Sequence, residues 1–190
     1  MEEMERNPEV IIAGEDIGAY GGAFKATSGL YEKFPDRVFD TPLAETAIAG
    51  LGVGAAYAGM KAVVEIMYAD FTTVVYDYLF NQITKSRYMT GWQDGGTNAC
   101  FILRAPCGAG FRSAAQHSQS VEAFFAHIPG LKVVIPSNPA DAKGLLKAAI
   151  RDDNPVIYFE HKGLFSMKGD VPDGDYVTPI GKANVVREGK

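Results

Sequence analysis

Five short apolar runs, separated by longer segments with helical character, constrain the fold of this chain more than any other feature. The runs are rich in Val and Ile and cover residues 10–13, 62–67, 100–103, 131–135 and 156–159. Strands that are buried on both faces have this composition, and they are typical of parallel sheets. Because these runs alternate with helical patterns, we predict an α/β domain with a mostly parallel sheet and helices on both faces.

Four segments between the runs are predicted to be helical. Two of them begin with a polar residue followed by proline, which suits a helix cap and the first helical position. The predicted helices start at Thr41 with Pro42, cover residues 71–87, start near Ser118 or Ser120, and run from Asn138 to about Ile150.

Three glycines, Gly50, Gly52 and Gly54, fall inside the first long helix. Each costs about 1 kcal/mol relative to alanine in a helix interior. A helix tolerates this cost where something must approach its backbone closely, either the sheet or another subunit.

The chain of 190 residues is long enough for one domain, or for one domain and the start of another. Residues 163–175 are rich in Gly, Asp and Pro and have no clear period, which indicates a linker. We expect residues 1–162 to form the α/β domain with a truncated first helix. Residues 163–190 are expected to be a linker and the start of a further domain.

The composition argues against several classes of partner. The formal net charge is -5 and there is no basic run, so nucleic acid is not an expected partner. The apolar runs end well before the roughly 20 residues of a membrane span, so no membrane association is expected. Cys100 and Cys107 are expected to be reduced thiols in a cytoplasmic protein.

Glu45 and His117 are the main candidates for chemistry. Glu45 falls near the start of a predicted helix, where the helix dipole favours a carboxylate and where open α/β sheets place ligands. His117 follows a Gly-rich loop and has polar neighbours, so it is suited to proton donation. Structural roles remain open for both residues.

Phe71 and Cys107 are weaker candidates. Phe71 follows a predicted strand and could stack on a flat heterocycle, although an aromatic there more often belongs to the core. Cys107 could act as a nucleophile with His117, but nothing in the sequence activates its thiol.

Several long motifs resemble one enzyme family. They cover residues 14–18 (GEDIG), 40–45 (DTPLAE), 115–120 (AQHSQS), 122–134 (EAFFAHIPGLKVV) and 136–156. Together they are similar, in order and over nearly the whole chain, to the β subunits of the E1 component of thiamine-diphosphate-dependent 2-oxo acid dehydrogenases. This family includes the pyruvate, branched-chain and acetoin dehydrogenases and has a transketolase-like fold.

The resemblance implies a cofactor shared between two kinds of subunit. An α subunit would hold the diphosphate and Mg2+, and the β domain would hold the aminopyrimidine within an α2β2 heterotetramer. The diphosphate motif, which begins Gly-Asp-Gly, is absent here because Gly174-Asp175 is followed by Tyr176. The chain would therefore be active only with its α subunit, and a lipoyl-bearing E2 would accept the acyl group.

The resemblance also assigns roles to individual residues. Glu45 matches the carboxyl group that hydrogen-bonds N1′ of the aminopyrimidine and so favours the tautomer that accepts the C2 proton. Leu43 and Phe71 match an apolar contact and the aromatic that stacks on the same ring. His117 matches a histidine near the substrate and the acyl acceptor.

A further implication concerns a metal ion. Some members of the family bind K+ through backbone carbonyls, at positions that match Ala149, Asp152 and Asn154.

Three functions follow as alternatives. The first is oxidative decarboxylation of a 2-oxo acid, with pyruvate as the expected substrate. The second is cleavage of acetoin, suggested by residues 108–112 and 179–183. The third is a non-catalytic binding fragment, against which the presence of both Glu45 and His117 argues.

Overall fold

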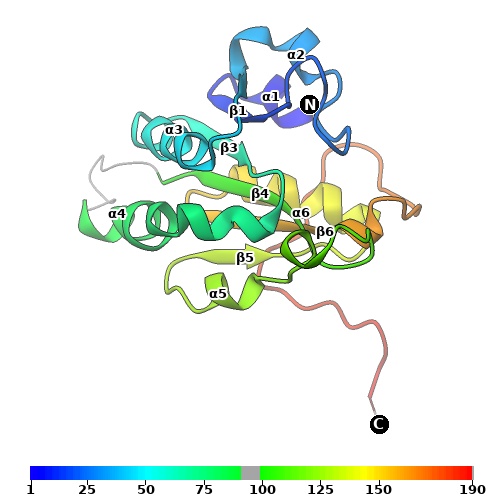
Figure 1. The fold of residues 1–190 in the computed structure, drawn as a ribbon. Coiled ribbons are helices and arrows are strands. Elements are labelled where there is room, and N and C mark those ends of the chain that lie inside the picture. The colour runs from blue at the N-terminus through cyan, green and yellow to red at the C-terminus, as the bar shows by residue number, and fades with distance from the viewer. Residues whose placement is uncertain (91–98, 190) are drawn as a thin grey trace.

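The fold is built on one six-stranded sheet with the strand order β2-β1-β3-β4-β6-β5 (Figure 1). This computed structural model describes residues 1–90 and 99–189. Every strand pair in these residues is parallel, which confirms the predicted α/β class. The strands are β1 Val10–Glu15, β2 Val38–Thr41, β3 Lys61–Glu65, β4 Phe101–Cys107, β5 Lys132–Val134 and β6 Val156–His161.

The central strands are buried on both faces of the sheet, which explains why strands such as β4 and β6 are continuous apolar runs. In β4, Phe101 and Leu103 belong to the core on one face, whereas Ile102 belongs to the core on the other. Ile157 and Tyr158 of β6 divide between the two faces in the same way. This alternation follows from the two-residue period of a strand.

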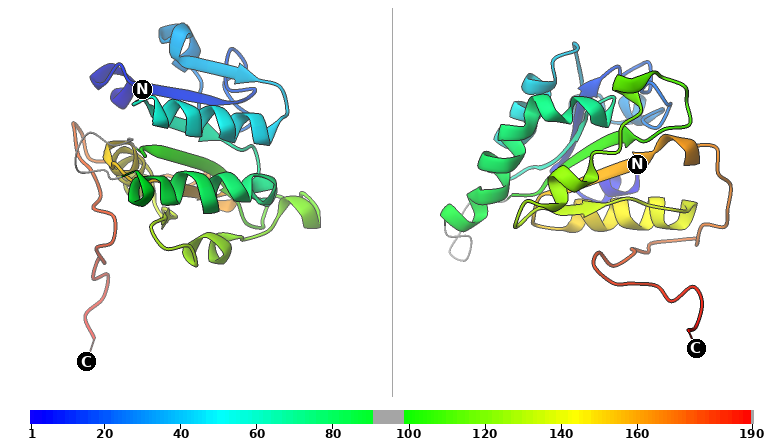
Figure 2. Two further views of the ribbon diagram at one scale, coloured as in Figure 1. Left: turned by 90° about the vertical axis from the view of Figure 1, so that its left-hand side faces the viewer. Right: turned by 60° about the horizontal axis from the view of Figure 1, so that its bottom comes forward.

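Helices cover the two faces of the sheet in separate layers (Figures 1 and 2). The first layer packs through α3, η2, η3 and α5, and the second through α1 and α6. The α-helices are α1 Glu2–Arg6, α2 Leu30–Lys33, α3 Glu45–Tyr57, α4 Thr84–Met89, α5 Glu122–Ala126 and α6 Pro139–Arg151. The 3-10 helices are η1 Pro35–Arg37, η2 Ala69–Val75, η5 Ala115–His117 and η6 Lys162–Leu164, and η3 Tyr78–Ile83 is a π-helix.

The prediction that a helix begins at Thr41 and Pro42 is wrong. Thr41 ends β2, and α3 begins at Glu45 with Ala44 as its cap residue. The strand β2 was not predicted because Asp40 and Thr41 interrupt its apolar residues, so it forms no apolar run.

Other helices agree with the prediction to different degrees. Asn138 caps α6 as expected, because its side chain accepts a hydrogen bond of 2.8 Å from the Asp141 amide. The helix expected near Ser118 or Ser120 begins later, at Glu122. The segment 71–87 is not one regular helix but passes through 3-10, π and α geometry.

The chain after η6 has neither helix nor strand among the described residues, and its end leaves the body of the molecule (Figure 1). Before that, it packs on α6. The Tyr176 hydroxyl donates to the Ala140 carbonyl at 2.8 Å, and Asp175 pairs with Arg151 at 2.6 Å. The irregular segment is therefore attached to the domain at residues 175–178.

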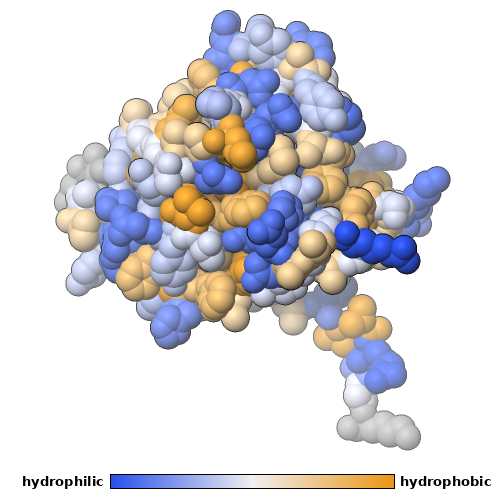
Figure 3. Space-filling view, in the orientation of Figure 1, coloured by the Kyte–Doolittle hydropathy of each residue, from blue (hydrophilic) through white to orange (hydrophobic). Residues whose placement is uncertain are grey.

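Hydrophilic and hydrophobic residues are interspersed over the face shown in Figure 3. In residues 1–90 and 99–189, the helices lack the combination of length and apolar character that crossing a membrane requires.

Candidate functional site

The carboxyl edge of the sheet brings the predicted site residues onto neighbouring elements. Strand β2 leads into α3 at Glu45, β3 leads into η2 with Phe71, and β4 leads through a loop to His117 in η5. Since all these strands are parallel, their carboxyl ends meet at one edge. Helix α3 contacts η2, and η2 contacts η5. A ligand at this edge can be reached from several loops.

Glu45 is the first residue of α3 and is half-buried. Ala44 provides no side-chain cap, so the N-terminal amides of the helix favour the nearby carboxylate. The charge of Glu45 also acts on Glu15 at the end of β1. Burial raises the pKa of Glu15, and repulsion from Asp16, Glu45 and Asp40 raises it further.

Of the two predicted apolar contacts, Leu43 lies two positions before Glu45 in the chain, and Phe71 lies on η2, which contacts α3. Leu43 precedes α3 and is 68% exposed in the isolated chain, so its side chain is available to a ligand or a partner. Phe71 is half-buried and packs against the core.

The His117 ring lies against two aromatic rings from the β3 side of the site. Its centroid is 5.2 Å from that of Phe71 and 4.6 Å from that of Tyr68, and both contacts are edge-to-face. His117 and Phe71, which are 46 positions apart by their numbers, are therefore direct neighbours. Tyr68 was not predicted as part of the site.

Two buried charged residues that hydrogen-bond the backbone at His117 and Gln119 were also not predicted. Lys162 is 1% exposed, and its ammonium group donates to the backbone carbonyl of His117. Asp70 is 6% exposed, and its Oδ1 accepts a 3.0 Å hydrogen bond from the Gln119 amide. The sequence gives no sign of either role, because most lysines and aspartates are exposed.

An aromatic cluster extends outward from Tyr68. Phe24 contacts Tyr68 and Phe111 with centroid distances of 6.0 Å, and it contacts Phe165 at 4.9 Å. Phe111 is 52% exposed, so the outer part of the cluster faces solvent in this chain.

Cys107 is not suited to act as a nucleophile. Its side chain is buried, and burial together with the neighbouring Glu122 carboxylate raises the pKa of the thiol to about 12. A thiol with this pKa is protonated at neutral pH, so Cys107 does not act as a nucleophile with His117. Cys107 and Cys100 are both free thiols, as expected.

The residues predicted to bind K+ lie at the opposite edge of the sheet, where α6 ends and β6 begins. The Ala149 carbonyl accepts from the Asp152 amide at 3.2 Å, and Asp152 accepts from the side chain of Asn154 at 2.8 Å. Asp152 also pairs with the Lys132 ammonium. Although burial opposes it, hydrogen bonds from Lys132 and Asn154 lower the pKa of Asp152. Among the described residues, no group of three or more His, Cys, Asp or Glu is arranged to hold a metal ion.

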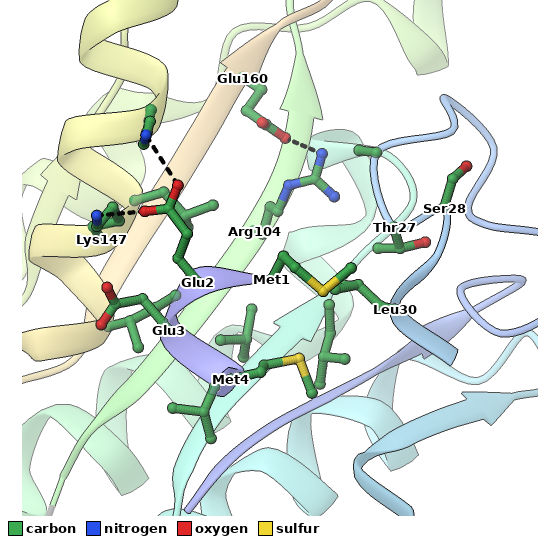
Figure 4. A pocket seen from close by; sticks show the side chains of 17 residues that line it. Met1, Glu2, Glu3, Met4, Thr27, Ser28, Leu30, Arg104, Lys147 and Glu160 are labelled. Atoms are coloured by element: carbon green, nitrogen blue, oxygen red, sulfur yellow. Dashed lines mark hydrogen bonds and ion pairs between the residues drawn. The ribbon is translucent and has the colours of Figure 1, made fainter. Parts of the chain in front are cut away.

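A cavity of about 350 Å³ lies elsewhere, between α1, α6 and the sheet (Figure 4). Its lining combines apolar side chains with ion pairs, including Lys147–Glu2 at 2.6 Å and Arg104–Glu160 at 2.5 Å. Glu45, Phe71 and His117 do not line it.

Comparison with known proteins relates this geometry to a family. The family described as "Transketolase, pyrimidine binding domain" matches residues 1–168. The "2-oxoisovalerate dehydrogenase subunit beta" of Bacillus subtilis is 54% identical over 190 residues, which are 99% of this chain and 57% of the relative. The "Acetoin:2,6-dichlorophenolindophenol oxidoreductase subunit beta" of Cupriavidus necator is 51% identical, over 100% of this chain and 58% of the relative.

A third relative carries another substrate name. The "Pyruvate dehydrogenase E1 component subunit beta" of Rhizobium meliloti is 49% identical, over 100% of this chain and 41% of the relative. The chain thus spans about half the length of the curated relatives it matches. Among solved structures, a "Split gene transketolase, inactive beta4 tetramer" has a TM-score of 0.65 at 22% identity, covering 85% of this chain and 48% of that one. This last likeness shows the fold.

Proposed function

We propose, from the premise that this chain belongs to the transketolase pyrimidine-binding domain family, that it is the aminopyrimidine-binding part of an E1 β subunit of a 2-oxo acid dehydrogenase. The observation that carries the proposal is the placement of Glu45, Phe71 and His117 on adjoining elements at the carboxyl edge of the sheet. Relatives named as β subunits of such enzymes support it.

The residues at this edge fit one end of thiamine diphosphate. Glu45 offers a half-buried carboxyl group at a helix N-terminus, which can hydrogen-bond a ring nitrogen. Phe71 offers an aromatic ring and Leu43 an exposed apolar side chain, both suited to a flat heterocycle. When bound, the cofactor supplies a carbanion and an electron sink for cleavage beside a carbonyl group.

The side chains of this domain would then manage protons and position. Glu45 would hold or release a proton at N1′ of the ring, and Phe71 would fix the plane of that ring. His117 would donate a proton to the substrate or guide the acyl group to its acceptor, since its ring is oriented by Tyr68 and Phe71.

Replacement of Glu45 tests this assignment. In the enzyme reconstituted with an α subunit, Glu45→Ala should lower kcat by about 100-fold or more, because proton transfer by a placed side chain contributes about that much. Glu32→Ala on α2 is the matched control, since Glu32 is exposed and lies outside the site. Assembly, followed by sedimentation, should be the same for both variants.

Full turnover by Glu45→Ala would remove the catalytic assignment. If wild-type chain assembled with its α subunit and thiamine diphosphate but had no turnover of any substrate, the alternative of a non-catalytic binding fragment would replace the proposal.

The substrate is proposed to be a 2-oxo acid, with pyruvate first, and acetoin is the alternative. The relative named for acetoin supports the alternative, and the relative named for 2-oxoisovalerate adds branched-chain acids. Steady-state turnover of pyruvate, 2-oxoisovalerate and acetoin by the reconstituted enzyme decides between them, because kcat/KM ratios measure discrimination directly.

The proposal includes the partners and the domain division. An α subunit would supply the diphosphate and Mg2+ sites in an α2β2 tetramer, and a lipoyl-bearing E2 would accept the acyl group. Residues 1–162 would form the pyrimidine-binding domain, and residues 163–190 a linker to a further domain. A K+ ion at Ala149, Asp152 and Asn154 and a cytoplasmic location remain predictions.

A further inference from the structure

We propose that Lys162 and Asp70 are positioning residues that hold the turn carrying His117, which is residues 115–119, from two sides. The inference rests on the proposed function, in which His117 acts on substrate. Its own evidence consists of two hydrogen bonds that buried charged groups make to the backbone at His117 and Gln119.

Lys162 holds the turn from the β6 side. It follows β6 directly, is 1% exposed, and donates from its ammonium group to the His117 carbonyl. Its Nζ is also 5.0 Å from the centroid of the Tyr68 ring, which itself contacts the His117 imidazole. In residues 1–90 and 99–189, no carboxylate forms an ion pair with Lys162.

This environment is unusual for a lysine. Burying an ammonium group costs several kcal/mol unless a partner compensates for the lost water. Here the compensation comes from a backbone carbonyl and an aromatic face, both of which belong to the surroundings of His117. The charge of Lys162 therefore serves the position of this turn and of Tyr68.

Asp70 holds the turn from the β3 side. It lies in η2 next to Phe71 and is 6% exposed. Its Oδ1 accepts from the Gln119 amide at 3.0 Å, and its buried Oδ2 has no hydrogen-bond partner among the described residues. Burying a carboxylate oxygen without a hydrogen-bond partner costs free energy. The hydrogen bond from the Gln119 amide is therefore the contact that keeps the Asp70 side chain against the loop.

The turn needs such support because its entry is strained. Arg112 and Ala114 have φ values of 52° and 59°, in the left-handed region that costs non-glycine residues about 1 kcal/mol or more. A strained backbone persists only where its surroundings fix it. Lys162 and Asp70 supply that restraint on consecutive peptide units, one at the His117 carbonyl and one at the Gln119 amide.

The first test measures turnover. In the reconstituted enzyme, Lys162→Met should lower kcat by about 10- to 100-fold with little change in KM, because a displacement of about 1 Å at a catalytic group costs this much. Lys147→Met is the matched control: Lys147 is also buried, but it lies on α6 and pairs with Glu2 and Asp175. The control should keep the wild-type kcat.

The second test observes the turn itself in the full chain by NMR. Lys162→Met should shift the His117 carbonyl carbon resonance, whereas Lys147→Met should leave it unchanged. Asp70→Ala should increase hydrogen exchange of the Gln119 amide at least 10-fold. Asp70→Asn, which keeps an acceptor oxygen, should retain most of the protection.

These readouts separate positioning from a general structural role. A merely structural lysine would change thermal unfolding without moving the His117 resonance or kcat. If Lys162→Met fails to fold, Lys162→Gln gives the same test, because the glutamine side chain is shorter and neutral and therefore lacks the ammonium group.

Two results distinguish the possible failures. If His117→Ala retains full turnover, the role of His117 in the proposed function is wrong. If Asp70→Ala exchanges Gln119 at the wild-type rate, or if Lys162→Met keeps both the wild-type kcat and the wild-type carbonyl shift, the positioning proposal is overturned.

Discussion

At the scale of single residues, negative charge accumulates where β1 and β2 end. Burial raises the pKa of Glu15 above its ordinary value of 4.5, and the charges of Asp16, Glu45 and Asp40 raise it further. The folded state therefore binds the Glu15 proton more tightly than the unfolded state does. At low pH this tighter proton binding adds to the free energy of unfolding. The added stability is lost as the pH rises from about 4.5 through the raised pKa of Glu15 in the folded state.

The pH dependence can be tested with Glu15→Gln. The neutral amide removes the repulsion, so this variant should unfold at a higher temperature than wild type at pH 7. Near pH 4 the difference should shrink, because Glu15 is then increasingly protonated in both states. Thermal unfolding followed by circular dichroism measures both values.

Glu9→Gln is the control for this comparison, since Glu9 is exposed just before β1. A destabilised Glu15→Gln at pH 7 would show that the carboxylate makes a favourable interaction that outweighs the repulsion.

Among the residues of the candidate site, some could be predicted from the sequence and others could not. Glu45, Phe71 and His117 were proposed from motifs, and the fold places them on adjoining elements. Lys162 and Asp70 were missed because their roles depend on burial beneath η5, which brings together segments up to 49 positions apart. A single sequence does not reveal such burial.

At the scale of elements, α3 lies so close to the sheet that one glycine in it has no room for a side chain. A Cβ at Gly52 would lie 2.5 Å from Cγ1 of Val64 and 2.8 Å from Cε2 of Phe101. Both neighbours belong to the core. The sheet therefore accounts for Gly52, while a Cβ at Gly54 would meet nothing within 4 Å.

Gly52 and Gly54 thus form a matched pair. Gly52→Ala should lower the free energy of unfolding by about 1–3 kcal/mol, because the core is already filled. Gly54→Ala should raise it by about 0.5–1 kcal/mol, because alanine is the better helix former. Urea unfolding of the isolated chain measures both, and equal effects of the two substitutions would contradict the packing argument.

Continuous apolar runs marked five of the six described strands, including the edge strand β5, which buries only Val134. Strand β2 was missed because Asp40 and Thr41 interrupt its apolar residues. The start of α3 was misplaced because Thr41 and Pro42 imitate a helix cap, although Thr41 pairs with Glu15 in the sheet.

At the scale of the whole molecule, the segment after the domain is attached to α6 through a second tightly packed glycine. A Cβ at Gly144 would lie 2.3 Å from Oγ1 of Thr178 and 2.8 Å from its backbone nitrogen. The Asp175 carboxylate adds ion pairs to Lys147 and Arg151, both at 2.6 Å. Residues far apart in sequence therefore determine the direction in which the chain leaves the domain.

Gly144→Ala should detach this segment. The added methyl group forces the backbone at Thr178 to move, so deuterium uptake at residues 175–178 should rise while the sheet remains protected. Hydrogen exchange read by mass spectrometry checks this, with Gly54→Ala as the control for a glycine replacement in a helix. Unchanged uptake would mean that α6 shifts instead of the segment.

The outermost strands of the sheet are brief, with four residues in β2 and three in β5. Unpaired backbone groups along a long sheet edge invite a strand from another chain, and this is a common route to aggregation. Such short borders offer an incoming strand few hydrogen bonds. Copies of this molecule should therefore resist stacking into a continuous sheet, and associations with other chains should use helices and loops.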